Sequence, residues 1–295
     1  MRLRALAPAK VNLSLFLGGV REDGRHRLAT VFESLSLADV LELDVQVESA
    51  GDLVVCPGVD GENLAARALA ALRSRGWDGP PVVVSIQKRI PVAAGMAGGS
   101  ADAAAALRLA MAVAPGRAEE VDAIAAELGA DVPSQLVPGL SVGSEAGEIV
   151  EHFEPLGEHA YVVVPSAYSL ATADVYREAD RLGLSRSTEE LAARYQELVA
   201  ALSRGVRPRD ELIVNDLERA AVSLCPSIVG VLEDVLAAGA EHALVSGSGP
   251  TVVGIWWGSG ASKRASEAAD PLVRSYPRAV VAEPVTAEYA APSLI

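Results

Sequence analysis

A glycine-rich segment carries the first residues of this sequence that could do chemistry. Residues 91–101 read PVAAGMAGGSA, and an alanine-rich run follows from Asp102 to about Val113. Small side chains let successive backbone N–H groups turn toward an anion, and a helix over the following run would point its positive end at the same place. We therefore expect a phosphate cradle. It is neither a Walker A loop nor a G-x-G-x-x-G fingerprint, and a flexible strand-to-helix connection is the alternative.

Lys10 is the second candidate. It lies in the segment PAKVNLSL at residues 8–15, where apolar residues alternate with Lys10, Asn12 and Ser14. Alternation of this kind predicts a strand with these three polar side chains on one face. For a lone lysine, a solvated outer face is the usual interpretation. A cation beside a phosphate cradle would be the functional one.

Asp131 is the third candidate, in the segment GADVP at residues 129–133. An aspartate between a glycine and a proline most often forms a turn or caps a helix. Phosphoryl transfer, however, needs cradled phosphates, a cation for the developing charge and a carboxylate for the attacking hydroxyl. The cradle, Lys10 and Asp131 together supply those parts.

Other polar and aromatic residues give weaker signals. Residues 246–251, SGSGPT, lack the order of a nucleophile elbow and taken alone predict a hairpin turn. His152, His159 and His242 have no partner in the sequence that distinguishes them from surface or core histidines. Trp256 and Trp257 lie in an apolar run, and alternation there would place one ring in the core and the other outside.

The apolar pattern predicts the elements that must hold these groups. Apolar and charged residues alternate from Leu41 to Glu48, as in a half-buried strand of an antiparallel sheet. Ser100 or Asp102 is expected to cap the helix that follows the glycine-rich segment. The mixture lacks regular βαβ alternation, so we predict two α+β domains, residues 1–155 and 156–295. Further strands are predicted at 82–86, 161–164, 243–245, 252–257 and about 280–281, and helices at 102–113, 121–128, 191–202 and 228–236.

Composition excludes several classes of function. The 295 residues include 25 Lys and Arg against 39 Asp and Glu, a net charge of −14, whereas a nonspecific nucleic-acid binder needs a basic face. Any anionic ligand must therefore be held by a local device. Cys56 and Cys225 form no CxxC pair, which is typical of a reducing cytosol. No stretch reaches the roughly 18 apolar residues of a membrane span. We expect a cytoplasmic protein with neither nucleic-acid nor membrane partners.

Three ordered segments resemble the motifs of the GHMP small-molecule kinases. Residues 8–13 are similar to the first motif, 91–101 to the phosphate-binding motif and 245–251 to the third. Within that superfamily, shorter segments are most similar to the kinases of 4-diphosphocytidyl-2-C-methyl-D-erythritol, in the methylerythritol phosphate route to isoprenoids. These shorter segments are residues 21–26, 62–64, 129–133, 172–176 and 215–218. The resemblance covers nearly the whole chain.

The resemblance implies a ribosomal-protein-like N-terminal domain with most of the ATP site, a ferredoxin-like C-terminal domain, and the substrate between them. It implies transfer of the γ-phosphoryl group of ATP to a hydroxyl of the methylerythritol moiety. Mg²⁺ is expected with ATP, and we expect a monomer or homodimer. Lys10 and Asp131 would be catalytic. The residues implied at ATP are Asn63, Lys88, Pro91, Gly95, Met96, Ala97, Gly98, Gly99, Ser100 and Ala101. Those implied at the substrate are Asn12, Arg25, His26, Thr172, Tyr176, Gly247 and Ser248.

Two departures from the family pattern leave the substrate open. Arg25 stands where the family usually has an aromatic residue that stacks on cytosine, and a guanidinium plane can also stack on a base. Glu145 and Ala146 stand where related sequences tend to have glycine and arginine. A related kinase of another polyol or sugar alcohol is one alternative. A non-catalytic ligand sensor is another, against which the retention of Lys10 and Asp131 argues.

Overall fold

A seven-stranded sheet forms one half of the molecule. The computed structural model describes residues 1–46, 48, 51–59, 61–91, 95–116 and 118–295. The sheet runs in the order β11-β1-β2-β4-β3, and β5 and β6 extend it along β2. Its strands are β1 (Arg2–Val20), β2 (His26–Val45), β3 (Leu53–Val55), β4 (Val82–Gln87), β5 (Leu140–Ser144), β6 (Ile149–Phe153) and β11 (Ser293–Leu294).

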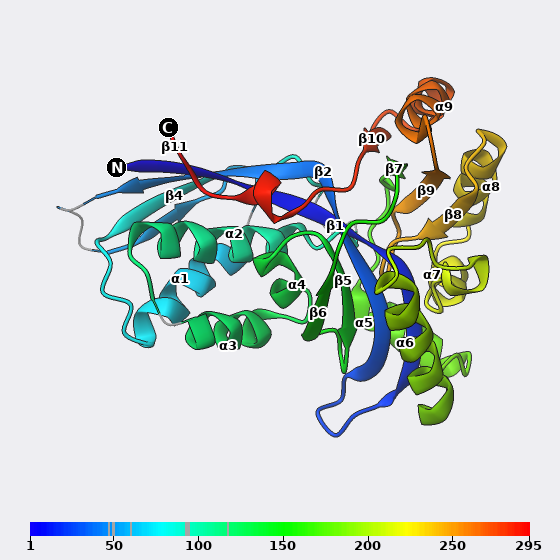
Figure 1. Ribbon diagram of the computed structural model, residues 1–295, viewed down its shortest axis with the longest axis horizontal. Coiled ribbons are helices and arrows are strands. Elements are labelled where there is room, and N and C mark those ends of the chain that lie inside the picture. The colour runs from blue at the N-terminus through cyan, green and yellow to red at the C-terminus, as the bar shows by residue number, and fades with distance from the viewer. Residues whose placement is uncertain (47, 49–50, 60, 92–94, 117) are drawn as a thin grey trace.

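Strands β1 and β2 form a long antiparallel ribbon that runs the length of this sheet (Figure 1). One end of β2 pairs with β4 through residues 40–45, and the other pairs with β5 through residues 30–33. Register shifts interrupt the β1–β2 pairing beside Pro8 and again beyond Asn12. Such irregularities bend a strand and redirect its side chains. The strand predicted around Lys10 is thus part of the ribbon that joins both halves of the protein.

Four helices, α1 (Leu64–Ser74), α2 (Gly98–Val113), α3 (Ala118–Leu128) and α4 (Val132–Leu136), cover one face of this sheet (Figure 1). Alanines of α2 are buried against β1 and β2, and their small size lets the helix pack closely. The expected helix cap is wrong. The helix begins at Gly98, its N-cap position is Ala97 in the left-handed region (φ 54°), and no described side chain caps it. Ser100 and Asp102 lie inside the helix, where Asp102 pairs with a lysine instead.

A four-stranded antiparallel sheet forms the other half, in the order β10-β7-β9-β8. Its strands are β7 (His159–Val164), β8 (His242–Val245), β9 (Val252–Trp257) and β10 (Val280–Ala282). Its helices are α5 (Thr172–Arg181), α6 (Thr188–Leu202), α7 (Glu218–Leu224), α8 (Ile228–Ala237) and α9 (Ala261–Ser275), with 3₁₀ turns η1 (Asp210–Leu212) and η2 (Ala287–Ala290). Every strand and helix predicted from the apolar pattern corresponds to one of these elements.

The second sheet is covered on both faces, and this corrects the expectation for the two tryptophans. Trp256 packs under helices α5 and α7–α9, whereas Trp257 packs on the opposite face with residues of β1, β2 and α6. The two residues are 1% and 8% exposed. Alternation along β9 does send the rings to opposite faces, but neither face meets solvent.

The end of the chain returns to its beginning. β11 pairs with β1 through Leu3 and Arg4, and η2 packs on β1, so both termini lie at the same end of the molecule (Figure 1). The division of the chain near residue 155 stays a prediction. Among the described residues, no helix combines the length and apolar character needed to cross a membrane.

Candidate active site

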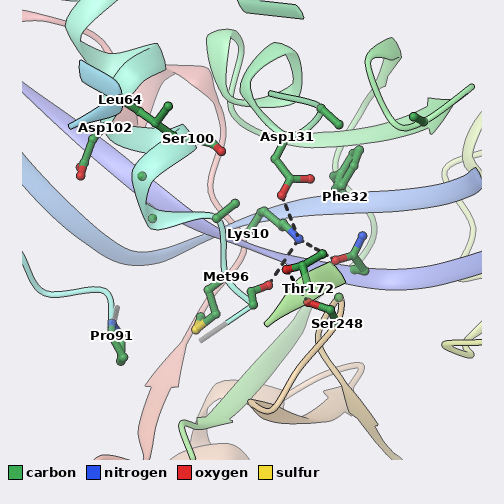
Figure 2. A pocket seen from close by; sticks show the side chains of 18 of the residues that line it. Lys10, Phe32, Leu64, Pro91, Met96, Ser100, Asp102, Asp131, Thr172 and Ser248 are labelled. Carbon is green, nitrogen blue, oxygen red and sulfur yellow. Dashed lines mark hydrogen bonds and ion pairs between the residues drawn. The ribbon is translucent and has the colours of Figure 1, made fainter. Parts of the chain in front are cut away.

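One cavity of about 480 Å³ collects segments from both halves of the molecule. The ribbon contributes Lys10 and Asn12, and α2 contributes its first turn. The glycine-rich loop between β8 and β9 closes one side. Figure 2 shows two ends of this cavity, one around Lys10, Asp131, Thr172 and Ser248, and another around Leu64, Asp102 and Pro91. Residues 92–94 of the predicted phosphate cradle lie outside the described residues.

Lys10 and Asp131 point toward one another at the first end. Lys10 Nζ lies 3.6 Å from Asp131 Oδ2 and donates a hydrogen bond of 2.7 Å to Asn12 Oδ1. Lys10 is 4% exposed and also lies 5.6 Å from the centre of the Phe32 ring, so the solvated outer face that is usual for a lone lysine does not apply to it. Asp131 keeps 35% of its side chain exposed, and so an ammonium fixed inside the protein faces a carboxylate that a ligand can reach.

A chain of hydrogen bonds fixes the partner of Lys10. Asn12 Nδ2 donates to Thr30 Oγ1 at 2.7 Å, and that hydroxyl donates to the carbonyl oxygen of Ser14, also at 2.7 Å. All three side chains are buried. Because the amide N–H of Asn12 is engaged by β2, its oxygen faces the ammonium of Lys10.

The start of α2 is open to the cavity. Gly98, Gly99 and Ser100 line it, and no described side chain caps the helix, so its first N–H groups face the cavity. The preceding residues are tied to the ribbon, since the Lys10 backbone N–H donates to the carbonyl oxygen of Met96. Free N–H groups and the helix dipole together favour an anion at this point.

The loop between β8 and β9 packs against this segment at glycines. Gly247 has φ 58°, and a Cβ there would lie 3.2 Å from both Asn12 Oδ1 and the Gly95 carbonyl oxygen. Asn215 braces the loop, because its Nδ2 donates to the carbonyl oxygens of Val245 and Gly247 at 2.7 Å each. Ser248 Oγ is 3.0 Å from Thr172 Oγ1 of α5. The turn predicted from small residues is therefore a wall of the cavity.

Buried charge lies at the second end. Lys88 Nζ donates to Asp102 Oδ2 at 2.7 Å and also to Asp39 Oδ2. Burial lowers the pKa of Lys88, but Asp102 and Asp39 outweigh it and the net direction is upward. Burial raises the pKa of Asp102 to about 7, with Lys88 opposing the rise and Asp39 adding to it. Nearby, Asn63 Oδ1 caps α1 by accepting from the backbone N–H of Ala65 at 2.8 Å.

Comparison with known proteins decides the family. The family described as "GHMP kinases N terminal domain" matches residues 63–139, and "GHMP kinases C terminal" matches residues 190–271. A 4-diphosphocytidyl-2-C-methyl-D-erythritol kinase of Streptomyces avermitilis is 44% identical, over 85% of this chain and 86% of that protein. The chain belongs to the GHMP kinase family. The predicted superfamily and α+β fold are confirmed.

A second relative and a solved structure agree with that assignment. A 4-diphosphocytidyl-2-C-methyl-D-erythritol kinase of Anaeromyxobacter sp. strain K is 42% identical, over 90% of this GHMP kinase and 84% of the relative. A crystal structure of 4-(cytidine 5′-diphospho)-2C-methyl-D-erythritol kinase has 32% identity and a TM-score of 0.75, and covers 95% of this chain and 98% of that one.

The cavity of this GHMP kinase is lined by most of the residues that were predicted at the catalytic, ATP and substrate sites. Three of the predicted residues do not line it. Ala101 is buried in the core under the first sheet. His26 is buried beside the cavity, where Nδ1 lies 2.9 Å from the carbonyl oxygen of Gly18 and Nε2 lies 3.2 Å from Asp180. Its ring lies against that of Tyr176, with centroids 5.3 Å apart. Tyr176 does line the cavity, and burial, with the charge of Asp131, raises its pKa.

Arg25 is the third residue outside the cavity. Its Nη2 lies 2.9 Å from Asp23 and 3.3 Å from Glu148, at the exposed end of the β1–β2 ribbon. Glu145, the acidic residue of the second departure from the family pattern, also forms an ion pair outside the cavity. Glu145 sits at φ 58° and lies 3.3 Å from Arg21, whereas Ala146 lines the cavity. Thus the acidic replacement turns toward arginine and only its small neighbour reaches the cavity.

Several residues of the site were not selected as site residues from the sequence. Phe32 and Asp39 became recognisable only through their contacts with Lys10 and Lys88, and Asn215, in the segment 215–218 that resembles the family, through its contacts with the β8–β9 loop. Asp39 is two positions before Leu41 in the alternating strand, so period two places it on the buried face, and an aspartate at such a position is the signal that could have found it. Cys56 also lines the cavity.

Proposed function

We propose that this GHMP kinase transfers the γ-phosphoryl group of ATP to a hydroxyl of 4-diphosphocytidyl-2-C-methyl-D-erythritol, in the methylerythritol phosphate route to isoprenoids. The relatives described above support that substrate. The single observation that carries the reaction type is the approach of Lys10 Nζ to Asp131 Oδ2, at 3.6 Å, in the same cavity as the open start of α2.

The proposed ATP site occupies the end of the cavity that α2 lines. The N–H groups of Gly98, Gly99 and Ser100 would bind phosphate oxygens, which the helix dipole favours. The glycine-rich segment before them, including Gly95, Met96 and Ala97, would wrap the same phosphates. Asn63 and Lys88 also line this end of the cavity and would lie near the adenosine. A chain with net charge −14 needs such a local device for a polyanion.

The proposed chemistry takes place between Lys10 and Asp131. The acceptor hydroxyl oxygen attacks the γ-phosphorus, the bond from that phosphorus to the β–γ bridging oxygen breaks, and ADP leaves with that oxygen. Asp131 accepts the hydroxyl proton, and Lys10 stabilises the negative charge of the phosphoryl group in the transition state. Asn12 keeps the ammonium in place through its hydrogen bond.

Mg²⁺ is proposed to enter with ATP. Among the residues that the structure describes, no group of three or more His, Cys, Asp or Glu side chains could hold a metal ion. The donor set therefore fits an ion held mainly by phosphate oxygens and water, which Mg²⁺ tolerates well. When bound, it would neutralise phosphate charge. The residues of this chain would bind and orient the nucleotide around it.

On the acceptor side, we propose that Thr172, Tyr176, Gly247 and Ser248 contact the substrate together with Asn12, since all of them line the cavity next to Asp131. His26 would act in the same region through the Tyr176 ring that it packs against. Arg25 would reach a bound base only after leaving Asp23 and Glu148.

A coupled ADP-release assay tests the proposed function. The purified protein, with ATP and Mg²⁺, is given 4-diphosphocytidyl-2-C-methyl-D-erythritol and, separately, a panel of small polyols and sugar alcohols. We expect ADP release only with the cytidyl compound. Turnover of another alcohol without stimulation by the cytidyl compound would favour the related kinase, and binding without any turnover would favour the sensor.

A further inference from the structure

Three charged residues form a cluster at the nucleotide end of the cavity. The proposed reaction does not explain why two carboxylates and one ammonium lie together at this place. Asp39 comes from β2, Lys88 follows β4, and Asp102 lies in α2. Lys88 Nζ bridges the two carboxylates. Asp39 Oδ1 also accepts the backbone N–H groups of Arg89 and Ile90. The Asp39–Lys88–Asp102 cluster thus ties the chain before the glycine-rich segment to the helix after it.

This cluster touches the place where phosphate is proposed to bind. A Cβ added at Gly98, the first residue of α2, would lie 3.3 Å from Lys88 Nζ. An anion held by the N–H groups of Gly98 to Ser100 would therefore lie beside Lys88. The negative charges of Asp39 and Asp102 would act on that anion electrostatically. Figure 2 shows Asp102 and Ser100 at the start of α2, with their side chains on different sides of the helix.

One carboxylate oxygen of Asp102 makes no hydrogen bond to the described residues. Asp102 is 3% exposed and lines the cavity, and this oxygen is its Oδ1. Its Oδ2 takes the whole contact with Lys88. A buried carboxylate with one unpartnered oxygen is costly when ionised, and that oxygen is free to carry a proton.

The groups around Asp102 do not offset this negative charge. Besides Lys88 and Asp39, Cys56 faces it from beyond β3, and burial together with Asp102 raises the pKa of that thiol. Glu62, which precedes α1, lines the same cavity and lies 3.4 Å from Arg67. On β1, the cation that lines the cavity is Lys10, which lies at the opposite end beside Asp131. On α2 itself, Arg108 donates to the backbone carbonyl oxygens of Leu6 and Gln135.

We propose that Asp102 takes up a proton when nucleotide binds, so that the cluster presents no net negative charge to the phosphates. With both carboxylates ionised, the cluster carries one excess negative charge beside a polyanion. With Asp102 protonated, Lys88 and Asp39 neutralise each other. This inference rests on the proposed ATP site. Asp102 would act as a positioning residue, because its protonation removes the net negative charge of the cluster beside the phosphates.

Proton uptake has a defined pH dependence. Burial raises the pKa of Asp102 to about 7, so a bound polyanion that moves this pKa further upward makes nucleotide bind more tightly at low pH. For an upward shift of about one unit, uptake reaches roughly half a proton per nucleotide midway between the two pKa values. Affinity then falls by about tenfold on the alkaline side.

Titration calorimetry in two buffers of different ionisation enthalpy measures this uptake directly. MgATP is titrated into the whole protein without acceptor alcohol, in steps from about pH 6.5 to about pH 8.5. We expect proton uptake with a maximum above pH 7 in the natural chain. Asp102→Asn has the shape of the protonated form, so it should bind MgATP without uptake and with little dependence on pH. Asp122→Asn, an exposed carboxylate of α3, is the matched control and should keep the uptake.

Each outcome decides something different. Binding of MgATP without uptake in the natural chain, or uptake that persists in Asp102→Asn, overturns the role of Asp102 and leaves the kinase assignment intact. No binding of MgATP by any form removes the proposed function and this inference with it. If circular dichroism shows that Asp102→Asn does not fold, Asp39→Asn decides. Loss of the Asp39 charge should move the uptake maximum to lower pH, and an unchanged maximum contradicts the proposal.

Discussion

Lys10 and Asp131 differ in how firmly the protein holds them. Lys10 is buried and touches Asn12, the Gly95 carbonyl oxygen and the face of Phe32, whereas the side chain of Asp131 is partly exposed toward the cavity. A buried cation with fixed partners keeps its position when substrate arrives. The accessible carboxylate is the member of the pair that can meet a hydroxyl proton, so the two residues should respond differently to substitution.

We therefore expect Asp131→Asn to lower kcat by about a hundredfold or more, which is the range for removal of an acid–base group. The amide keeps the size of the side chain but accepts a proton poorly, so KM for ATP should change little. Steady-state assays of both substrates measure this. Asp122→Asn carries the same chemical change at an exposed position of α3 and should leave kcat intact. Turnover of Asp131→Asn near that of the natural chain would remove Asp131 from the mechanism.

How much of the site the sequence predicts depends on the kind of residue. Lys10, Asp131 and the glycine-rich segment could be selected because phosphoryl transfer needs their chemical types. Their convergence depends on a ribbon bent between its two ends, which no local pattern encodes. Arg25 shows the opposite case, because neighbouring acids in sequence and space draw it away from the cavity.

Among the elements, two glycine-containing turns do the positioning that side chains do elsewhere. The loop between β8 and β9 and the segment before α2 approach each other so closely that a methyl group at Gly247 would meet Asn12, Gly95 and Lys10. The apolar pattern located both flanking strands and α2, since burial has a period. It did not locate the start of α2, because Ala97 occupies the N-cap position by backbone conformation and not by a capping side chain.

Gly247→Ala should lower kcat by about tenfold or more, because its Cβ would crowd the contacts of Lys10 as well as strain the backbone. Gly258→Ala is the matched control. Gly258 also has a positive φ, of 78°, but a Cβ there would meet nothing within 4 Å. Both variants should lose about 1 kcal/mol of stability from the backbone alone. Equal kcat values for the two variants would contradict a positioning role for the loop.

Asn215→Asp tests the brace of the same loop. The substitution keeps the oxygen that accepts from the Leu217 N–H but removes both donors to Val245 and Gly247. Two buried carbonyl oxygens lose this donor and face a buried carboxyl group instead, so we expect a loss of at least about 1–3 kcal/mol in the free energy of unfolding. Denaturant titration measures that loss. Because the loop carries Ser248 into the cavity, KM for the alcohol should rise as well. An unchanged KM would mean that the brace serves stability alone.

At the scale of the whole molecule, a buried polar cluster joins the two sheets. Glu33 of β2 lies 2.8 Å from His159 Nε2 and accepts from the Tyr161 hydroxyl, both of β7. The His159 ring stacks on Trp257 of β9 at 4.6 Å between centroids. All these residues are buried. The cavity draws its walls from both halves, so whatever holds the sheets together also holds the site together. The sequence shows no partner for His159, because Glu33 is 126 positions away.

The stability of the protein should therefore fall as pH rises through the titration of His159. Burial lowers its pKa, but the charge and hydrogen bond of Glu33 outweigh burial and raise the pKa above its usual value. The folded state thus binds a proton that the unfolded state releases first, so the stabilisation is complete below about pH 6.5 and is lost above the raised pKa.

His159→Gln keeps a donor for Glu33 but cannot be protonated. Its melting temperature should show a flatter decline between about pH 6.5 and 8.5, with each kcal/mol worth about 2–4 °C in a chain of this size. His152→Gln is the control, since burial lowers the pKa of His152 and the titration of such a group gives no decline of stability with rising pH. A decline in His159→Gln as steep as in the natural chain and in the control would assign the pH dependence to other groups.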